Sequence, residues 1–406
     1  METDNKRPLP NGWRWVRLGE VTRVVSGSTP RSGVEEYWEG DIVWITPTDL
    51  GKLNSREIST SDRRITMAGY KSCGTELIPP QSVVMSSRAP IGHLGIARVP
   101  LCTNQGCKSF VPGPGIVTEF LYYCLKQSVP QFQAMGSGAT FSEVSKAAVK
   151  AFEIPLPALE EQKRIAAILD EQTEAVGRAR TAAKGQLEAA KALPAAYLRA
   201  VFSSADAQHG LKKPLGEISK LLPSKSIATN GDAEVLAITT ACLSEGGFLT
   251  SGVKVARMWA KDVVECTIAP GEVLIARSNT PDLVGRVAMY AGEPKGVVAS
   301  DLTIRIWPTN DLTSEFLTAY LSFLYQTGYW KERAGGASGS MKKITRQQIQ
   351  SEQVPVPTRD NQQRIVAMLN EHMASADRAR RAAEEQLDVI NKLPAALFRR
   401  AFAGEI

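Results

Sequence analysis

Apolar and small residues recur at spacings of three and four along two long stretches of the chain. They fall at Ile165, Leu169, Val176, Ala179, Ala183, Leu187, Ala190 and Leu193, and again at Ile365, Leu369, Ala376, Ala379, Ala383, Leu387, Ile390 and Leu393. This period places them on one stripe of an α-helix. A single narrow stripe leaves a helix poorly buried, so we expect the two helices to pair as a coiled coil, parallel or antiparallel. The alternative is two separate helices, each lying on its own domain.

Prolines mark the expected ends of these helices. Pro157 and Pro357 precede acidic residues, an order typical of a helix start. Pro194 and Pro394 are expected to break or kink the helices, with an Ala/Leu-rich turn continuing to Phe202 and Phe402. About 30 residues per helix then correspond to a length of roughly 50 Å.

The two helical stretches are copies of one sequence. Residues 154–202 and 354–402 align at an offset of 200 without a gap, and 21 of the 49 positions are identical. Weaker similarity extends in front of them, as in Leu18-Gly19-Glu20 and Leu215-Gly216-Glu217. The chain is therefore two units of about 200 residues, related by a pseudo-twofold repeat. Each unit has a divergent N-terminal part, called the front below, and a better matched C-terminal part.

The fronts carry a different pattern. Short runs of β-branched and aromatic residues, bounded by Gly, Pro, Asn and Asp, predict strands. Helical patterns lie near 118–127 and 314–326. The strand runs are Ile42–Ile45, Ser82–Met85, Val235–Ile238, Glu272–Ile275 and Thr303–Trp307. The fold class is therefore α+β, with two mixed, mainly β domains at 1–157 and 206–357 and two helices at 158–205 and 358–406.

Composition adds limits on class and location. The 406 residues suffice for two or three domains, and no stretch approaches a membrane span or a signal peptide, so we expect a cytoplasmic protein. The six cysteines and three histidines form no metal-site spacing. The net charge is +6, and the excess of Lys and Arg lies in the fronts: residues 1–150 hold 17 against 13 acidic residues, whereas residues 151–205 hold seven of each. Such basic blocks fit contact with a polyanion, and ordinary surface charge is the alternative.

The chain resembles the specificity (S) subunit of type I restriction-modification systems over essentially its whole length. The motifs that carry the resemblance are Leu9-Pro10-Asn11-Gly12-Trp13, Ser87-Arg88-Ala89-Pro90-Ile91-Gly92, Asn104-Gln105-Gly106, and the two Pro-x-Pro helix starts followed by Gln162-x-Arg164-Ile165 and Gln362-x-Arg364-Ile365. Singly they are weak, but their order and duplication are specific.

The resemblance implies two target recognition domains held apart by an antiparallel coiled coil, and recognition of a bipartite DNA sequence with an unspecified gap. It implies no catalysis and no cofactor in this chain. Two modification (methyltransferase) subunits with S-adenosylmethionine, and two restriction subunits with ATP and Mg, are the implied partners. Half-site centres about one DNA turn apart, roughly 34 to 36 Å, are expected for such a duplicated reader.

Polar residues in the loops of the fronts are candidates for DNA contact, because Arg, Asn and Gln pair with base edges while Lys, Ser and Thr hold phosphates. Each also has a structural alternative: Asn104-Gln105-Gly106 fits a turn, and Arg88 fits a pair with a carboxylate. The candidates are Thr46, Thr48, Ser87, Arg88, Asn104, Gln105, Lys108 and Thr140 in the first front, and Thr239, Thr240, Arg277, Ser278, Asn279, Ser340, Lys342 and Lys343 in the second.

The helices are the expected partner surface. Leu198, Phe202, Phe398 and Phe402 are candidate contacts for the modification subunits, with core packing as the alternative. Two other functions stay open: an orphan DNA-binding module without partners, and a metal-dependent nuclease built on Asp282 and Glu293-Pro294-Lys295. The flanking Gly292 and Gly296 make that last segment a turn rather than a strand, which argues against the nuclease. No P-loop and no Asn/Asp-Pro-Pro-Tyr/Phe methyltransferase motif occurs in the sequence.

Overall fold

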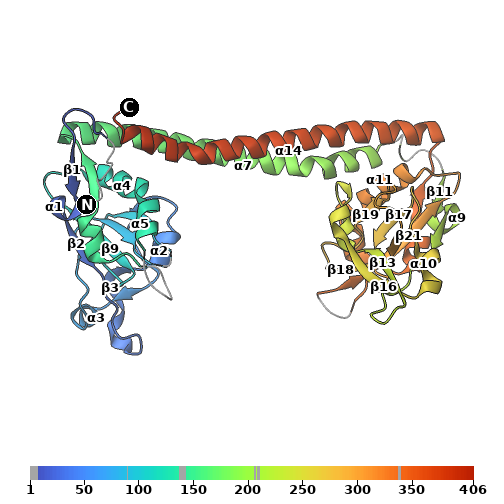
Figure 1. Ribbon diagram of the computed structural model, residues 1–406, viewed down its shortest axis with the longest axis horizontal. Coiled ribbons are helices and arrows are strands. Elements are labelled where there is room, and N and C mark those ends of the chain that lie inside the picture. The colour runs from blue at the N-terminus through green and yellow to red at the C-terminus, as the bar shows by residue number, and fades with distance from the viewer. Residues whose placement is uncertain (1–7, 89, 137–142, 205–206, 208–210, 337–339) are drawn as a thin grey trace. The chain divides into compact units, whose positions relative to one another are not determined.

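A computed structural model gives the fold of residues 8–88, 90–136, 143–204, 207, 211–336 and 340–406. The contacts divide the chain into two compact units (Figure 1). Unit 1 comprises residues 1–183 and 386–406, and unit 2 comprises residues 184–385. Each unit therefore holds one globular domain together with parts of both long helices.

The first globular domain, residues 14–156, is built on two sheets. The larger sheet has the strand order β2-β9-β6-β7-β4, and the smaller has β5-β3-β8 with β3 and β8 parallel. The strands are β1 (Arg14–Arg17), β2 (Thr22–Ser26), β3 (Trp38–Ile45), β4 (Glu57–Ile58), β5 (Arg64–Ile65), β6 (Val83–Ser86), β7 (Leu94–Ala97), β8 (Leu101–Thr103), β9 (Cys107–Pro112) and β10 (Glu153–Leu156). The helices are α1 (Leu18–Val21), α2 (Pro47–Gly51), α3 (Met67–Lys71), α4 (Thr118–Gln127), α5 (Val129–Met135) and α6 (Lys146–Ala151), with a 3-10 turn at Glu35–Tyr37.

The second globular domain, residues 212–355, repeats this topology. Its main sheet has the order β12-β21-β17-β19, which matches β2-β9-β6-β7, and its second sheet has β16-β13-β20 with β13 and β20 parallel. The strands are β11 (Lys212–Pro214), β12 (Ser219–Leu222), β13 (Ala233–Ile238), β14 (Leu243–Ser244), β15 (Gly247–Phe248), β16 (Val253–Met258), β17 (Val273–Ala276), β18 (Ser278–Asn279), β19 (Val287–Met289), β20 (Val297–Ala299), β21 (Thr303–Pro308), β22 (Lys342–Lys343) and β23 (Gln353–Pro355). The helices are α9 (Leu215–Ile218), α10 (Ala260–Cys266), α11 (Ser314–Gln326), α12 (Tyr329–Arg333) and α13 (Arg346–Gln350), with 3-10 turns at Thr240–Cys242 and Thr250–Gly252. All five predicted strand runs and both short predicted helices are confirmed.

Two long helices carry the domains: α7 (Leu159–Phe202) and α14 (Arg359–Ala401). In unit 1, Ile165 and Leu169 near the start of α7 share a core with Phe398 and Phe402 near the end of α14. In unit 2, the roles are exchanged, because the end of α7 packs with the start of α14. The helices therefore run antiparallel, as predicted.

The helices were expected to break or kink at Pro194 and Pro394, and the break is wrong. Both helices continue through their proline, to 44 and 43 residues instead of about 30. A helical proline removes one hydrogen bond from the carbonyl four residues earlier. Buried residues on both sides, Ala190 and Leu198 around Pro194, hold the helix by packing. Tertiary contacts of the apolar stripe thus outweigh the local preference.

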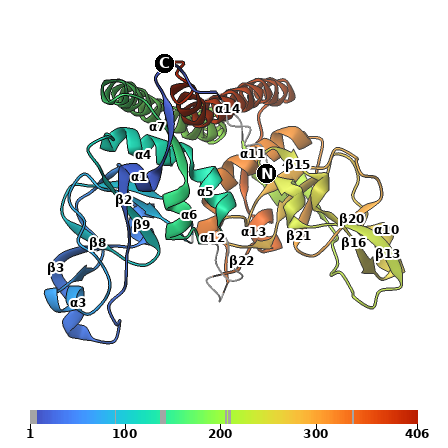
Figure 2. The same cartoon turned by 60° about the vertical axis from the view of Figure 1, so that its left-hand side comes forward.

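Each globular domain is joined to the helices in the same way. A terminal strand pair, β1 with β10 and β11 with β23, brings the two ends of the domain together at the start of a long helix. Helices α4 and α11 then lie against the long helices within their units (Figure 2). Gln162 ties down the start of α7 by accepting from Val117 N at 2.9 Å and donating to the carbonyls of Gly115 and Pro157. Gln362 makes the equivalent three bonds in unit 2.

No helix in the described part of the chain is both long and apolar enough to cross a bilayer.

Candidate nucleic-acid interface

The first cluster of candidates lies where β6 ends and β9 begins. Ser87 N donates to Gly106 O at 2.7 Å, and Val144 N donates to Ser87 O at 3.0 Å. These two backbone bonds join three segments that are far apart in sequence. They gather a cluster at one end of these two inner strands of the main sheet: Ser87, Arg88, Asn104, Gln105, Lys108 and Glu143.

A carboxylate lies between the two cations of this cluster. Glu143 Oε1 accepts from Lys108 Nζ at 3.1 Å, and Glu143 Oε2 lies 3.7 Å from Arg88 Nη1. Lys108 Nζ also donates to Ser87 Oγ at 3.0 Å, and the residue is only 3% exposed. The Lys108 ammonium group therefore acts inside the domain, whereas Arg88 is partly exposed and is held by Glu143 from one side. The sequence-based interpretation missed Glu143.

Several candidates of the first cluster have structural partners. Asn104 Oδ1 accepts from Gly106 N at 2.9 Å, so the turn expected as the alternative for this segment is present. The exposed Gln105 is bonded to the Thr29 hydroxyl. A Cβ on Gly106 would lie 2.9 Å from Pro47 and 3.3 Å from Arg88 Nε, so only glycine lets these groups meet here.

Thr46 and Thr239 occupy equivalent places after β3 and β13. Each is the N-cap of a short helical turn: Thr46 Oγ1 accepts from Asp49 N at 3.3 Å, and Thr239 Oγ1 accepts from Ala241 N at 3.3 Å. Capping satisfies backbone donors at a helix start, so both hydroxyls have a structural role. Thr48 is exposed and Thr240 is half-buried. Thr140 lies outside the described residues.

The second cluster uses the same backbone frame with different side chains. Arg277 N donates to Leu302 O and Ile344 N donates to Arg277 O, both at 2.8 Å, as Ser87 does in the first cluster. β18 then pairs with β22, which places Ser278 opposite Lys343 and Asn279 opposite Lys342. Ser340 is exposed in the turn before β22. The structure therefore brings Arg277, Lys342 and Lys343 together.

The second cluster carries a lysine at the position where the first cluster carries the carboxylate of Glu143. Lys343 stands 200 positions after Glu143 and occupies the equivalent place beside the strand end. Arg346 lies nearby, and burial, followed by the charge of Arg277, lowers the pKa of its guanidinium. The Arg277 Nε is buried without a hydrogen-bond partner, while its Nη1 donates to Asp301 O at 3.3 Å. Among the described residues, this cluster thus brings Arg277, Lys343 and Arg346 together and has a lysine at the place of Glu143.

The four candidate partner contacts lie in the cores. Leu198 and Phe202, which is 1% exposed, belong to the core of unit 2, and Phe398 and Phe402 belong to the core of unit 1. Their burial favours core packing, the alternative stated for them. The exposed faces of the helices carry charged residues instead, among them Arg178 and Arg378.

The residues of the nuclease hypothesis have other surroundings. Asp282 is exposed and pairs with Lys331 at 2.7 Å. Glu293-Pro294-Lys295 lies in the turn between β19 and β20, as its sequence predicted. Among the described residues, no group of three or more His, Cys, Asp and Glu is placed to hold a metal ion.

Two copies of one domain, each with polar residues at equivalent strand ends and each packed on an antiparallel helix pair, define a protein with an internal structural repeat. Residues 10–182 and 212–386 both match the family described as "Type I restriction modification DNA specificity domain". The chain therefore belongs to this family.

Individual relatives agree with the family. The MjaIX specificity subunit of Methanocaldococcus jannaschii is 39% identical over 170 residues, which cover 41% of this chain and 39% of that one. The StySPI specificity subunit of Salmonella potsdam is 22% identical over 433 residues, covering 99% and 91%. The chain spans about two fifths of the length of the MjaIX relative and of the EcoR124I/EcoR124II relative of Escherichia coli that it matches.

Two solved structures share the fold. One, from work on complex assembly and conformational transition of the type I R-M system, has a TM-score of 0.76 at 22% identity and covers 99% of this chain and 100% of that one. The other, the HsdS subunit of Thermoanaerobacter tengcongensis, has a TM-score of 0.64 at 21% identity, with both chains fully covered.

Proposed function

We propose that this chain is the DNA sequence-recognition subunit of a type I restriction-modification complex and that each globular domain reads one half of a bipartite target. The observation that supports it best is the repeated frame with unlike side chains: Ser87 and Arg277 make the same backbone bonds. The next residue along pairs Arg88 with Glu143 in the first domain and Ser278 with Lys343 in the second. One pose on DNA can therefore serve two different half-sites. The proposed recognition domains are residues 1–157 and 206–357, and the spacer helices are 158–205 and 358–406.

The chemistry of the two clusters fits DNA. Arginine pairs with the O6 and N7 acceptors of guanine, and lysine neutralises phosphates without reading sequence. On this basis Arg88 and Arg277 are base-reading candidates, and Lys342 and Lys343 are phosphate contacts. Lys108, beneath the surface, supports Arg88 through Glu143. Pseudo-twofold symmetry matches the symmetry of the DNA backbone, so half-site centres about one turn apart, roughly 34 to 36 Å, are expected.

Catalysis is proposed to belong to partners. Two methyltransferase subunits with S-adenosylmethionine, and two restriction subunits with ATP and Mg, are the partners that we propose for this chain in the cytoplasm. The relatives named above are specificity subunits of type I restriction enzymes. Because Leu198, Phe202, Phe398 and Phe402 are buried, the exposed helix faces around Arg178 and Arg378 are the surface that we propose for the modification subunits.

Co-expression of this chain with a modification subunit encoded in a neighbouring reading frame tests this function. We expect a stable complex that methylates a bipartite site, which sequencing of methylated bases would reveal. A single continuous site would contradict the two-reader proposal. An orphan DNA-binding module is the second candidate. It predicts sequence-specific binding by the chain alone and no copurifying methyltransferase.

A further inference from the structure

The globular domains rest on the helices through apolar contacts that are alike in both units. In unit 1, the Phe402 ring lies 5.4 Å from Phe120, and Phe398 lies 5.6 Å from Tyr123. In unit 2, Phe202 lies 5.7 Å from Phe316 and 5.4 Å from Tyr320. Such burial holds a domain in place but is not directional, so it fixes orientation weakly.

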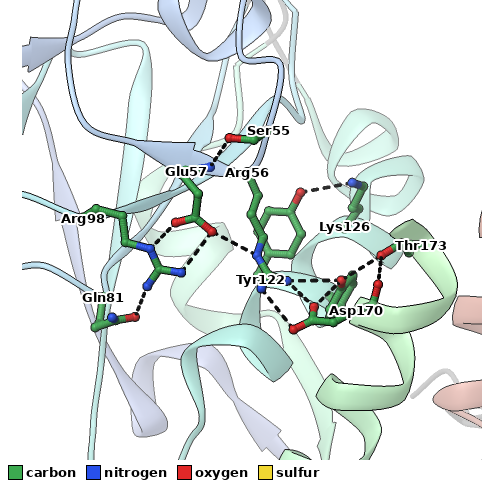
Figure 3. Close-up of polar contacts among 10 residues, drawn as sticks. Ser55, Arg56, Glu57, Gln81, Arg98, Tyr122, Lys126, Asp170 and Thr173 are labelled. Carbon is green, nitrogen blue, oxygen red and sulfur yellow. Dashed lines mark hydrogen bonds and ion pairs between the residues drawn. The ribbon is translucent and has the colours of Figure 1, made fainter. Parts of the chain in front are cut away.

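Unit 1 adds a directional contact that crosses from the domain to the helix. Arg56, directly before β4, donates through both Nη atoms to the two carboxylate oxygens of Asp170 on α7, with Nη2 and Oδ2 3.0 Å apart (Figure 3). Tyr123 Oη donates to Asp170 Oδ1 at 2.6 Å and lies 3.1 Å from Thr173 Oγ1. A bidentate guanidinium–carboxylate pair restricts both distance and angle.

Arg56 also contacts a second carboxylate, that of Glu57. Arg56 Nε lies 3.3 Å from Glu57 Oε1, and Arg98 Nη2 donates to the same oxygen at 3.0 Å (Figure 3). Arg98 Nη1 donates in turn to Gln81 Oε1 at 2.8 Å. Charged groups therefore form a continuous chain from the main sheet to the helix, so a movement of the sheet strains the pair with Asp170.

The pair is partly sheltered from water. The side chains of Arg56 and Asp170 are 24% and 31% exposed, less than those of most ion pairs along the helices. The hydrogen bond to Asp170 raises the pKa of Arg56, and burial, then the bond to Asp170, raises the pKa of Tyr123. Shielding from water makes such a pair stronger than a fully exposed one.

The repeat shows that this contact belongs to unit 1. At the offset of 200, Asp170 and Thr173 are replaced by Asn370 and Met373. Met373 packs on the apolar core of unit 2, and Asn370 lines a surface hollow with Trp307 and Arg359. The carboxylate that receives Arg56 and Tyr123 is therefore present in the first copy of the helix and not at the aligned position of the second.

We infer that Arg56 and Asp170 are positioning residues that set the orientation of the first globular domain on helix α7, and thereby the gap length accepted between the two half-sites. The inference rests on the proposed function, because a gap exists only for a bipartite target. Neither residue reads a base. The pair lies on the side of the domain that faces the helix, and its effect reaches DNA through the orientation of the whole domain.

The test measures gap selectivity of the full chain in complex with its modification subunits. Duplexes carry both half-sites with the gap shortened or lengthened by up to two base pairs. Asp170→Asn removes one charge with almost no change of shape, and the helix already carries asparagine at the equivalent position 370. We expect its preference for the native gap over gaps one base pair different to fall at least fivefold. Arg56→Gln should do the same.

Controls separate positioning from folding. Glu160→Gln breaks an exposed pair with Lys163 on the same helix and should leave the gap profile unchanged. The exchange Arg56→Glu with Asp170→Arg should recover at least part of the selectivity, even if a single variant binds all duplexes weakly. A wild-type gap profile in Asp170→Asn, or a loss that the exchange does not reverse, overturns the inference alone. A wild-type complex without any gap preference overturns the proposed function as well.

Discussion

Glu143 and Lys343 are the residues at which the two clusters differ most. Glu143 neutralises Lys108, which is buried, so its removal leaves a cation without its counter-charge inside the first domain. We predict that Glu143→Gln destabilises unit 1 by about 1–3 kcal/mol and weakens binding of the first half-site only. Thermal melting and binding to duplexes with one altered half-site measure the two effects. Equal weakening of both half-sites would contradict the prediction.

Lys342 and Lys343 are expected to act on any sequence. Replacing Lys342 with alanine should weaken binding to specific and non-specific DNA alike and lower the slope of log affinity against log salt by about one. Arg277→Ala should instead cost about 1–3 kcal/mol at the second half-site alone. Titrations at several salt concentrations distinguish the two behaviours, and a salt-slope change for Arg277→Ala without loss of specificity would reverse the assignment.

Glu352 gives a pH dependence in the second domain. Burial raises the pKa of this carboxyl above its usual 4.5, although a hydrogen bond from Tyr329 opposes the shift. A raised folded-state pKa gives stability that is present below the unfolded value and is lost as the pH rises through the folded value. Glu352→Gln should therefore stabilise unit 2 by about 0.5–2 kcal/mol at pH 7.5. The gain should shrink toward pH 4, as melting curves across this range would show.

Side-chain chemistry was only partly predictable from the sequence. The turn at Asn104-Gln105-Gly106 was recognisable because its residues are local. Glu143 and the pair of Arg56 with Asp170 were not, because their partners are 35 and 114 positions away. No periodicity carries such information. The one usable signal was the repeat, in which Glu143 aligns with Lys343 and Asp170 with Asn370.

At the scale of elements, the apolar stripes predicted both helices, and the strand runs predicted the centres of both main sheets. The prolines do not end the helices, because packing of the apolar stripe outweighs the local preference of proline, and the local sequence does not show that packing. The aromatic residues beyond each proline close the core of the unit in which their helix ends. This exchange of ends follows from antiparallel pairing, which the stripe alone left open.

Those aromatic residues allow a selective test. Phe202→Ala should destabilise unit 2 by about 3–5 kcal/mol, the usual range for a buried phenylalanine, because its ring contacts Phe316, Tyr320 and Phe323. Phe402→Ala should act on unit 1 instead. Hydrogen exchange of α11 and of α4 should report the two losses separately. Equal loss of protection in both helices for either variant would show that the units do not unfold independently.

For the whole molecule, the duplication is visible in the sequence, and the two globular domains share one topology. The division into units is not visible there, because each unit takes its helical parts from residues about 200 positions apart. The proposed function adds a prediction at this scale. One extra heptad in both helices, near Gly185 and Glu385, keeps the apolar stripe and adds about 10 Å of helix. Methylated targets should then show a gap longer by up to about three base pairs, and an unchanged gap would refute the spacer role.

The single aspartate at position 170 also bears on how such proteins can be recombined. A first globular domain transplanted to the second position would bring its arginine to an asparagine and a methionine. The transplanted domain would keep apolar contacts with the helices but would lack the ion pair that Arg56 makes with Asp170. Asn370→Asp with Met373→Thr would restore the partner of that arginine. Two helix residues outside both globular domains therefore belong to the design of any working chimera.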